Sequence, residues 1–132
     1  MKEHAQNLIE RFKDAEPAHA HVDDFLNMSI ATQIKVLRKQ RGLTQKQLGQ
    51  LAGMQQDAIC RLENIRYSGW SVLTLKRLAK AFDVALKVSF ESFDTLIHDA
   101  GSFSKESLQR DTRLDALHKL GRPNNFNWTD LT

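Results

Sequence analysis

Residues 38–63 decide the fold, and they read RKQRGLTQKQLGQLAGMQQDAICRLE. Thr44 followed three residues later by Gln47 is a capping box, which predicts that a helix begins there. Gly53 predicts a turn after about two helical turns, because glycine readily adopts the left-handed backbone conformation. A second short helix is predicted over about residues 56–63. The inward faces are assigned to Leu48, Leu51 and Ala52 in the first helix and to Ala58, Ile59 and Leu62 in the second.

A further helix is predicted on each side of this pair. Ser29 is a candidate N-cap for a helix that ends before Gly42, and Ser71 is a candidate N-cap for a helix that follows a loop over residues 64–70. Their apolar stripes are Ile30, Ile34 and Leu37 in the earlier helix, and Val72, Leu75, Leu78, Ala79 and Phe82 in the later one. Residues 29–83 are therefore predicted to form a small helical domain.

The hydrophobic period changes from helical to alternating after this domain, over residues 84–91. Val84, Leu86, Val88 and Phe90 alternate with polar or small residues, which is typical of a strand with one apolar face. No comparable second strand is found in the sequence, and a lone strand leaves its backbone groups unpaired. We therefore expect the same strand of a second copy to pair with it across a two-fold axis. The alternative is an extended loop packed on its own domain.

The flanking segments carry weaker signals. Residues 1–28 are predicted to be an N-terminal helix that Pro17 ends, followed by a linker over residues 17–22 and a short turn capped by Asp23 or Asp24. Residues 92–132 are predicted to be a helical and loose extension. Its helical signals lie at 93–98, 105–110 after Ser104, and 112–120, and its end is turn-rich.

Charge is distributed unevenly along the 132 residues. Residues 29–82 hold ten basic and two acidic residues and so carry +8, while the whole chain carries only +3, which leaves −5 for the rest. A basic middle between acidic flanks is expected of a domain that binds a polyanion. The alternative is a set of solvated helix faces. Two short helices joined by a glycine turn in a basic helical domain favour a helix-turn-helix that binds DNA.

Several other classes of function are not supported by the sequence. The single cysteine, Cys60, excludes an internal disulfide, and we expect it to be an unremarkable thiol rather than an oxidant sensor. His19 and His21 lack neighbouring ligands, so no metal and no cofactor are expected. No glycine-rich phosphate loop or catalytic triad is present, so we expect no enzyme. The absence of a long apolar run or an apolar signal core predicts a soluble, cytoplasmic protein with no membrane partner.

The order of these residues resembles the Xre family of lambda-repressor-like regulators over about residues 29–85. The match is carried by Arg38, Arg41, Gly42, Leu43, Thr44, Gln45, Leu48, Gly49, Ala52, Gly53, Ile59, Leu62, Glu63, Asn64, Thr74, Leu75, Leu78, Ala79, Ala81 and Phe82. The continuation over residues 82–90 is similar to Xre members, some of them antitoxins, whose strand after the last helix pairs across the dimer. The resemblance implies a mainly helical fold with one such strand.

The resemblance also implies roles for individual residues. Arg38 and Glu63 are expected to form a structural ion pair between the first and third helices. The expected DNA phosphate contacts are Thr44, Gln45, Lys46, Asn64 and Arg66. The expected base contacts are Gln55, Gln56, Asp57 and Arg61, because glutamine can bridge adenine and arginine can bridge guanine. Asp57 either accepts from cytosine or favours the positive helix end. Tyr67 and Trp70 are expected to anchor their loop on the core, or Trp70 to touch the DNA backbone.

The leading functional hypothesis is a homodimeric transcription regulator, such as a repressor, that binds double-stranded DNA at an inverted-repeat operator. The alternative is an antitoxin that represses its own operon and also binds a toxin protein. Aromatic side chains in the acidic flanks favour that alternative, because exposed aromatics can fold onto a partner. They are Phe12, Phe25, Phe93, Phe103, Phe126 and Trp128.

Overall fold

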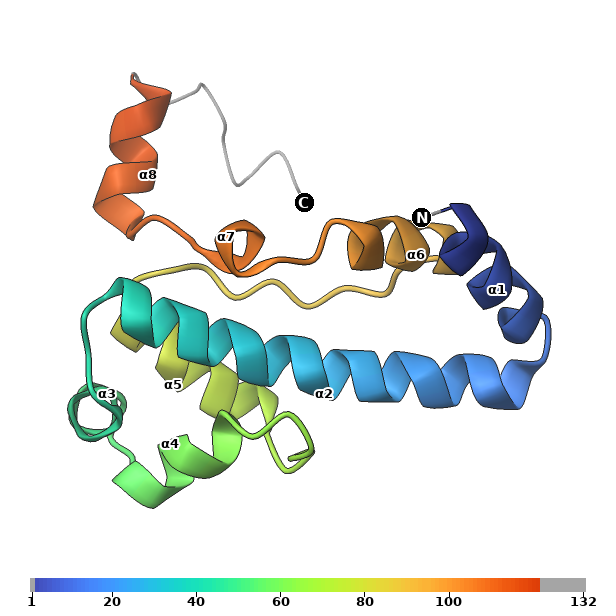
Figure 1. Cartoon of the computed structure of the whole chain (residues 1–132). Helices are drawn as coiled ribbons and strands as arrows, with labels where there is room; N and C mark the ends of the chain where they lie inside the picture. Colours follow the sequence, from blue (N-terminus) through green and yellow to red (C-terminus); the bar gives the residue numbers. More distant parts are fainter. Residues whose placement is uncertain (1, 122–132) are drawn as a thin grey trace, which may run out of the picture.

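The computed structural model describes residues 2–121, and within them the regular secondary structure is entirely α-helical (Figure 1). One long helix runs through the middle, with the helix-turn-helix on one side and the flanking helices on the other. The elements are α1 (Lys2–Phe12), α2 (Ala15–Gln40), α3 (Gln45–Ala52), α4 (Gln56–Leu62), α5 (Val72–Phe82), α6 (Phe93–Gly101), α7 (Lys105–Leu108) and α8 (Arg113–Leu120). No helix among these residues is both long enough and apolar enough to cross a membrane.

The long helix α2 corrects the prediction for the N-terminal flank. Pro17 does not end a helix but occupies the third residue of α2, and the predicted linker over 17–22 is helical. Proline is tolerated there because the first backbone N–H groups of a helix have no intrahelical acceptor. Ser29 is not an N-cap either. It lies inside α2, and its hydroxyl donates to the Leu26 carbonyl at 3.0 Å.

A single apolar cluster joins α2, α3, α4 and α5. Leu48 and Ile59 are fully buried at its centre, and Tyr67 and Trp70 pack against it from the loop after α4, as predicted. The other buried members are Ile34, Leu37, Ala52, Leu62, Leu75, Leu78 and Phe82. Leu51 was assigned to the inward face of α3, but it is 61% exposed, so that part of the prediction is wrong.

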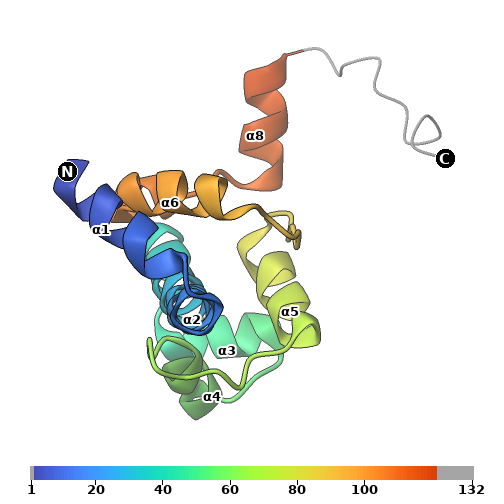
Figure 2. The same cartoon turned by 90° about the vertical axis from the view of Figure 1, so that its right-hand side faces the viewer.

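Helices α1, α6 and α7 lie on the opposite side of α2 from the helix-turn-helix (Figures 1 and 2). The rings of Phe12 and Phe93 meet edge to face with centroids 5.6 Å apart, and those of Phe25 and Phe103 meet in the same way at 5.6 Å. Leu108 of α7 is buried, and the Gln33 side chain donates to its carbonyl at 3.1 Å. Four of the six flanking aromatics therefore contact one another within the chain. Phe126 and Trp128 lie outside the described residues.

Residues 83–92 connect α5 to α6 without secondary structure, so the predicted strand is not formed within the described part of this single chain. The Val84 amide closes the end of α5 on the Ala79 carbonyl at 2.9 Å, and Val84 packs against the core. Beyond it the segment runs extended along α2 toward α6 (Figure 1). The three predicted C-terminal helices are present as α6, α7 and α8, and α8 projects away from the rest of the molecule.

Candidate nucleic-acid interface

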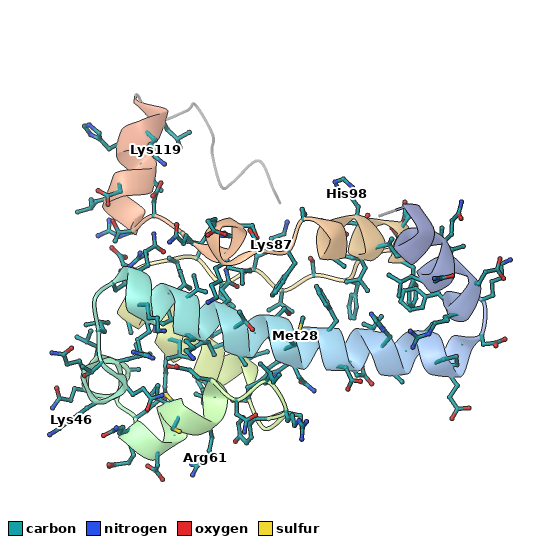
Figure 3. The ribbon with its side chains drawn as sticks, in the orientation of Figure 1. Met28, Lys46, Arg61, Lys87, His98 and Lys119 are labelled. Atoms are coloured by element: carbon teal, nitrogen blue, oxygen red, sulfur yellow. The ribbon has the colours of Figure 1, made fainter. Side chains whose placement is uncertain are left out.

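The outer face of α4 carries the four residues expected to contact bases. Gln55, Gln56, Asp57 and Arg61 are all exposed, while Ile59 and Leu62 on the opposite face are buried in the core. Gln55 is the N-cap residue, and its side chain makes no capping hydrogen bond, which leaves the amide available to a ligand. In Figure 3, Arg61 points away from the body of the protein.

Asp57 and Arg61 contact each other on this face. One guanidinium nitrogen of Arg61 lies 3.3 Å from the Asp57 carboxylate, and both side chains are more than half exposed. An exposed pair of this kind four residues apart on a helix stabilises it by only a few tenths of a kcal/mol. Arg61 can therefore exchange this contact for a base or a phosphate at little cost.

The start of α3 presents a second group of expected DNA contacts. Thr44 and Gln47 form the predicted capping box. The backbone N–H of Gln47 donates to the Thr44 hydroxyl at 3.1 Å, and the backbone N–H of Thr44 donates to the side-chain oxygen of Gln47 at 2.9 Å. Gln45 is the first helical residue and is half-buried, and Lys46 is exposed. Lys46 points outward at the same end of the molecule as Arg61 (Figure 3). The positive end of α3 and these donors suit a phosphate.

The loop after α4 holds the two remaining phosphate candidates. The Asn64 side-chain oxygen accepts the Arg66 amide at 3.0 Å, which fixes the turn and leaves both side chains exposed. Further along, the Trp70 indole N–H donates to the Asn27 side chain at 3.2 Å. The indole N–H of Trp70 is therefore engaged inside the protein, and Trp70 anchors the loop in the structure.

A buried ion pair holds α4 to α2 behind the exposed face. Arg38 Nε donates to Glu63 at 2.7 Å and Arg38 Nη2 donates to its other oxygen at 3.0 Å, while Nη1 donates to the Leu43 carbonyl at 2.9 Å. The two side chains are only 12% and 5% exposed. The hydrogen bonds to Glu63 raise the pKa of the Arg38 guanidinium above its ordinary value, so Arg38 remains charged. The structure thus brings together the two residues expected to pair.

The turn between α3 and α4 depends on two glycines. Gly53 has φ 69° and ψ 38°, in the left-handed region where a Cβ is unfavourable. Gly49 is required for a different reason, since a Cβ built on it would lie 2.5 Å from the Met54 carbonyl oxygen. The Gly49 carbonyl itself accepts the Met54 amide at 2.8 Å. The close approach is therefore between α3 and the turn backbone, and it fixes the angle at which α4 is presented.

Arg41 has a structural role that the sequence did not predict. Its Nε donates to the Phe82 carbonyl at 2.9 Å and its Nη1 donates to the Arg110 carbonyl at 2.8 Å, which joins the end of α2 to the end of α5 and to the segment after α7. Gln40 adds a contact by accepting the Arg110 amide at 3.0 Å. No local signal could have found these contacts, because the partners lie 41 to 70 residues away in sequence.

The two histidines of α2 pack against aromatic rings. The His19 ring meets Phe93 and the His21 ring meets Phe12, both edge to face. Among residues 2–121, no group of histidine, cysteine and carboxylate side chains is arranged to hold a metal ion. Cys60 is exposed on α4.

Comparison with known proteins agrees with this geometry. No curated protein and no solved structure matches the chain. Residues 34–88 match a family model described as helix-turn-helix. This stretch runs from within α2 to the extended segment and contains all of α3, α4 and α5. The match supports a helix-turn-helix domain over residues 34–88, which suggests a DNA-binding transcriptional regulator.

Proposed function

We propose that this protein is a cytoplasmic, Xre-type regulator that binds an inverted-repeat operator as a homodimer and represses transcription there. In this proposal α4 enters the major groove, and Gln55, Gln56, Asp57 and Arg61 contact base edges. Thr44, Gln45, Lys46, Asn64 and Arg66 contact phosphates and fix the position of α4. Val84, Leu86, Val88 and Phe90 form the strand that pairs between the two copies. No catalysis and no cofactor are involved.

The observation that carries the proposal is the two-sided character of α4. Its inner face is fixed by fully buried Ile59 and by the ion pair that the next residue after α4, Glu63, makes with Arg38. Its outer face carries exposed polar side chains that are able to read base edges, namely Gln56, Asp57 and Arg61. A helix held rigidly by its core and unobstructed on its polar face is suited to base recognition, because little conformational freedom is lost on binding.

The charge of the domain supports the same partner. Residues 29–82 carry +8, and Lys35, Lys39, Lys46, Lys76 and Arg77 are all exposed. Binding to a polyanion should release counterions, so the affinity should fall steeply as the salt concentration rises. Charge alone does not give sequence preference, which in this proposal comes from α4.

The experiment that tests the proposal is selection of bound duplexes from a random pool, followed by fluorescence anisotropy at several salt concentrations. We expect the selected sequences to contain two inverted half-sites about one helical turn apart, since two recognition helices related by a two-fold axis must meet the same face of the duplex. We expect binding to the selected duplex to be at least about a thousandfold tighter than to its scrambled version. Equal affinity for both would reject sequence-specific regulation.

An antitoxin remains the second candidate, and one observation favours it. Leu114, Leu117 and Leu120 lie on one face of α8 and are 63%, 54% and 65% exposed. Three exposed leucines at helical spacing form a surface that a partner protein can cover. The aromatic residues of the flanks give less support than the sequence suggested, because Phe12 and Phe93 contact each other.

The antitoxin alternative is tested by co-expression with the product of a small reading frame adjacent to the gene. Co-purification and neutralisation of a toxic product would establish it. Substitution of the three leucines by serine should then abolish co-purification and leave DNA binding unchanged. If the adjacent product neither binds the protein nor is toxic, the antitoxin alternative is rejected, whereas the regulator proposal stands.

A further inference from the structure

An open apolar groove lies between α5 and the extended segment that follows it. Its volume is about 460 Å³, and its lining consists of Val72, Lys76, Ala79, Lys80, Val84, Leu86 and Val88. Val84, Leu86 and Val88 thus face α5 across the groove, whereas Phe90 does not line it. The apolar side chains of the segment become more exposed along the chain. Val84 packs against the core, whereas Leu86, Val88 and Phe90 are 38%, 69% and 106% exposed.

We propose that this groove receives Phe90 from a second copy of the chain, and that the two segments cross at Val88. The inference rests on the homodimer proposed above and specifies which residues of the two segments lie opposite each other. A two-fold axis reverses the direction of the second segment. It therefore places Phe90, the most exposed residue of one segment, beside the less exposed Leu86 end of the other segment. Because of the two-fold symmetry, the same contact forms twice.

The alternation of side chains restricts where the axis can lie. If the axis passes through a residue, each even-numbered residue lies opposite an even-numbered residue, and the apolar side chains of both segments share one face. If it passes between two residues, the register slips by one and the apolar side chains of the two segments lie on opposite faces. Lys87, Val88 and Ser89 are the positions near the middle of the segment. An axis at Lys87 places two lysines opposite each other. Like charges directly opposite are destabilising.

An axis at Ser89 removes that repulsion but loses apolar contact. It pairs Lys87 with Glu91, and an exposed pair of this kind contributes at most about 1 kcal/mol. It also places Leu86 opposite Ser92, so that the only apolar pair left is Val88 with Phe90.

An axis at Val88 combines apolar contact with the absence of like-charge pairs. Val88 then lies opposite its own copy, and Leu86 lies opposite Phe90 on both sides. Because Leu86 lines the groove, Phe90 of the second copy enters it. Lys87 lies opposite Ser89, which carries no charge. This register therefore fills the groove and brings the exposed apolar side chains of both copies together.

Cysteine cross-linking tests the register in the full chain with Cys60→Ser, which removes the native exposed thiol. Lys87→Cys, Val88→Cys and Ser89→Cys are compared after mild oxidation on non-reducing gels. With the axis at Val88, Val88→Cys is expected to cross-link most completely. The Cα atoms of two copies of Lys87→Cys would lie about 8 Å apart, beyond the reach of a disulfide.

A second measurement tests the groove itself through the dimer dissociation constant, determined by analytical ultracentrifugation. Phe90→Ala is expected to raise this constant at least tenfold. Leu73→Ala is the matched control, because Leu73 is 63% exposed on α5 but does not line the groove, and it should leave the constant unchanged.

The outcomes separate this inference from the proposed function. A dimer that cross-links best at Lys87→Cys or Ser89→Cys, or at none of the three positions, overturns the register and leaves the homodimer standing. An unchanged dissociation constant for Phe90→Ala overturns the groove contact. A wild-type chain that remains monomeric at high concentration and on DNA rejects the homodimer together with this inference.

Discussion

Removal of the Glu63 carboxylate is expected to destabilise the domain strongly. In Glu63→Ala, Arg38 loses two charge-assisted hydrogen bonds of 2.7 and 3.0 Å and retains only the Leu43 carbonyl, at a site where its side chain is only 12% exposed in the native structure. Breaking a buried pair in this way costs about 3–5 kcal/mol, because the remaining charge is uncompensated. That is a large part of the 5–15 kcal/mol by which domains are typically stable. The free energy of unfolding is measured by urea titration with circular dichroism.

Two further variants show whether the uncompensated charge is the cause. Arg38→Met combined with Glu63→Leu should recover most of the lost stability, since apolar replacement of a whole buried pair is close to neutral. Asp57→Ala, which breaks the exposed pair with Arg61, should cost no more than about 0.5 kcal/mol. The reasoning is refuted if Glu63→Ala costs as little as Asp57→Ala, or if the double variant is no more stable than Glu63→Ala.

The remaining predictions concern the helix-turn-helix backbone. Gly49→Ala should lower the free energy of unfolding by about 1–3 kcal/mol, because its Cβ meets the Met54 carbonyl oxygen at 2.5 Å and this clash outweighs the better helix propensity of alanine. Gly101→Ala, which has no atom within 4 Å of the added Cβ, should be neutral or slightly stabilising, and equal effects at both glycines would contradict the close approach. Thr44→Val should cost about 1 kcal/mol in the same urea titration, because it removes the capping hydrogen bond to the Gln47 amide. No loss of stability in Thr44→Val would mean that the cap does not hold α3.

The helix-turn-helix could be predicted from the sequence because its determinants are local. Thr44 and Gln47 interact within one turn of a helix, and Ser71 caps α5 by accepting the Thr74 amide three residues away at 3.2 Å. Gly53 adopts the left-handed conformation that its position in the pattern requires. The exposed face of α4 followed from the same periodicity that placed Ile59 inside.

The errors arose where tertiary contacts decide the structure. Pro17 usually ends a helix, but at the third residue of α2 it costs no hydrogen bond, and the helix beyond it is covered by α1 and α6. The aromatic contacts of His19 and Phe93 that help to cover it link residues far apart in sequence. Arg41 could not be assigned for the same reason. A strand over residues 84–91 would depend on a second chain, so alternation alone predicts its faces but not its partner.

The most direct test of the central claim compares Arg61→Ala with Lys46→Ala on the selected operator and on scrambled DNA, at one fixed salt concentration. Arg61 is proposed to contact a base, so Arg61→Ala should weaken operator binding by about 1–3 kcal/mol, roughly 5- to 150-fold, and affect scrambled DNA much less. Lys46→Ala should weaken both by similar factors, since a phosphate contact carries no sequence information. Equal losses on both DNAs for Arg61→Ala, with folding intact, would contradict base recognition by α4.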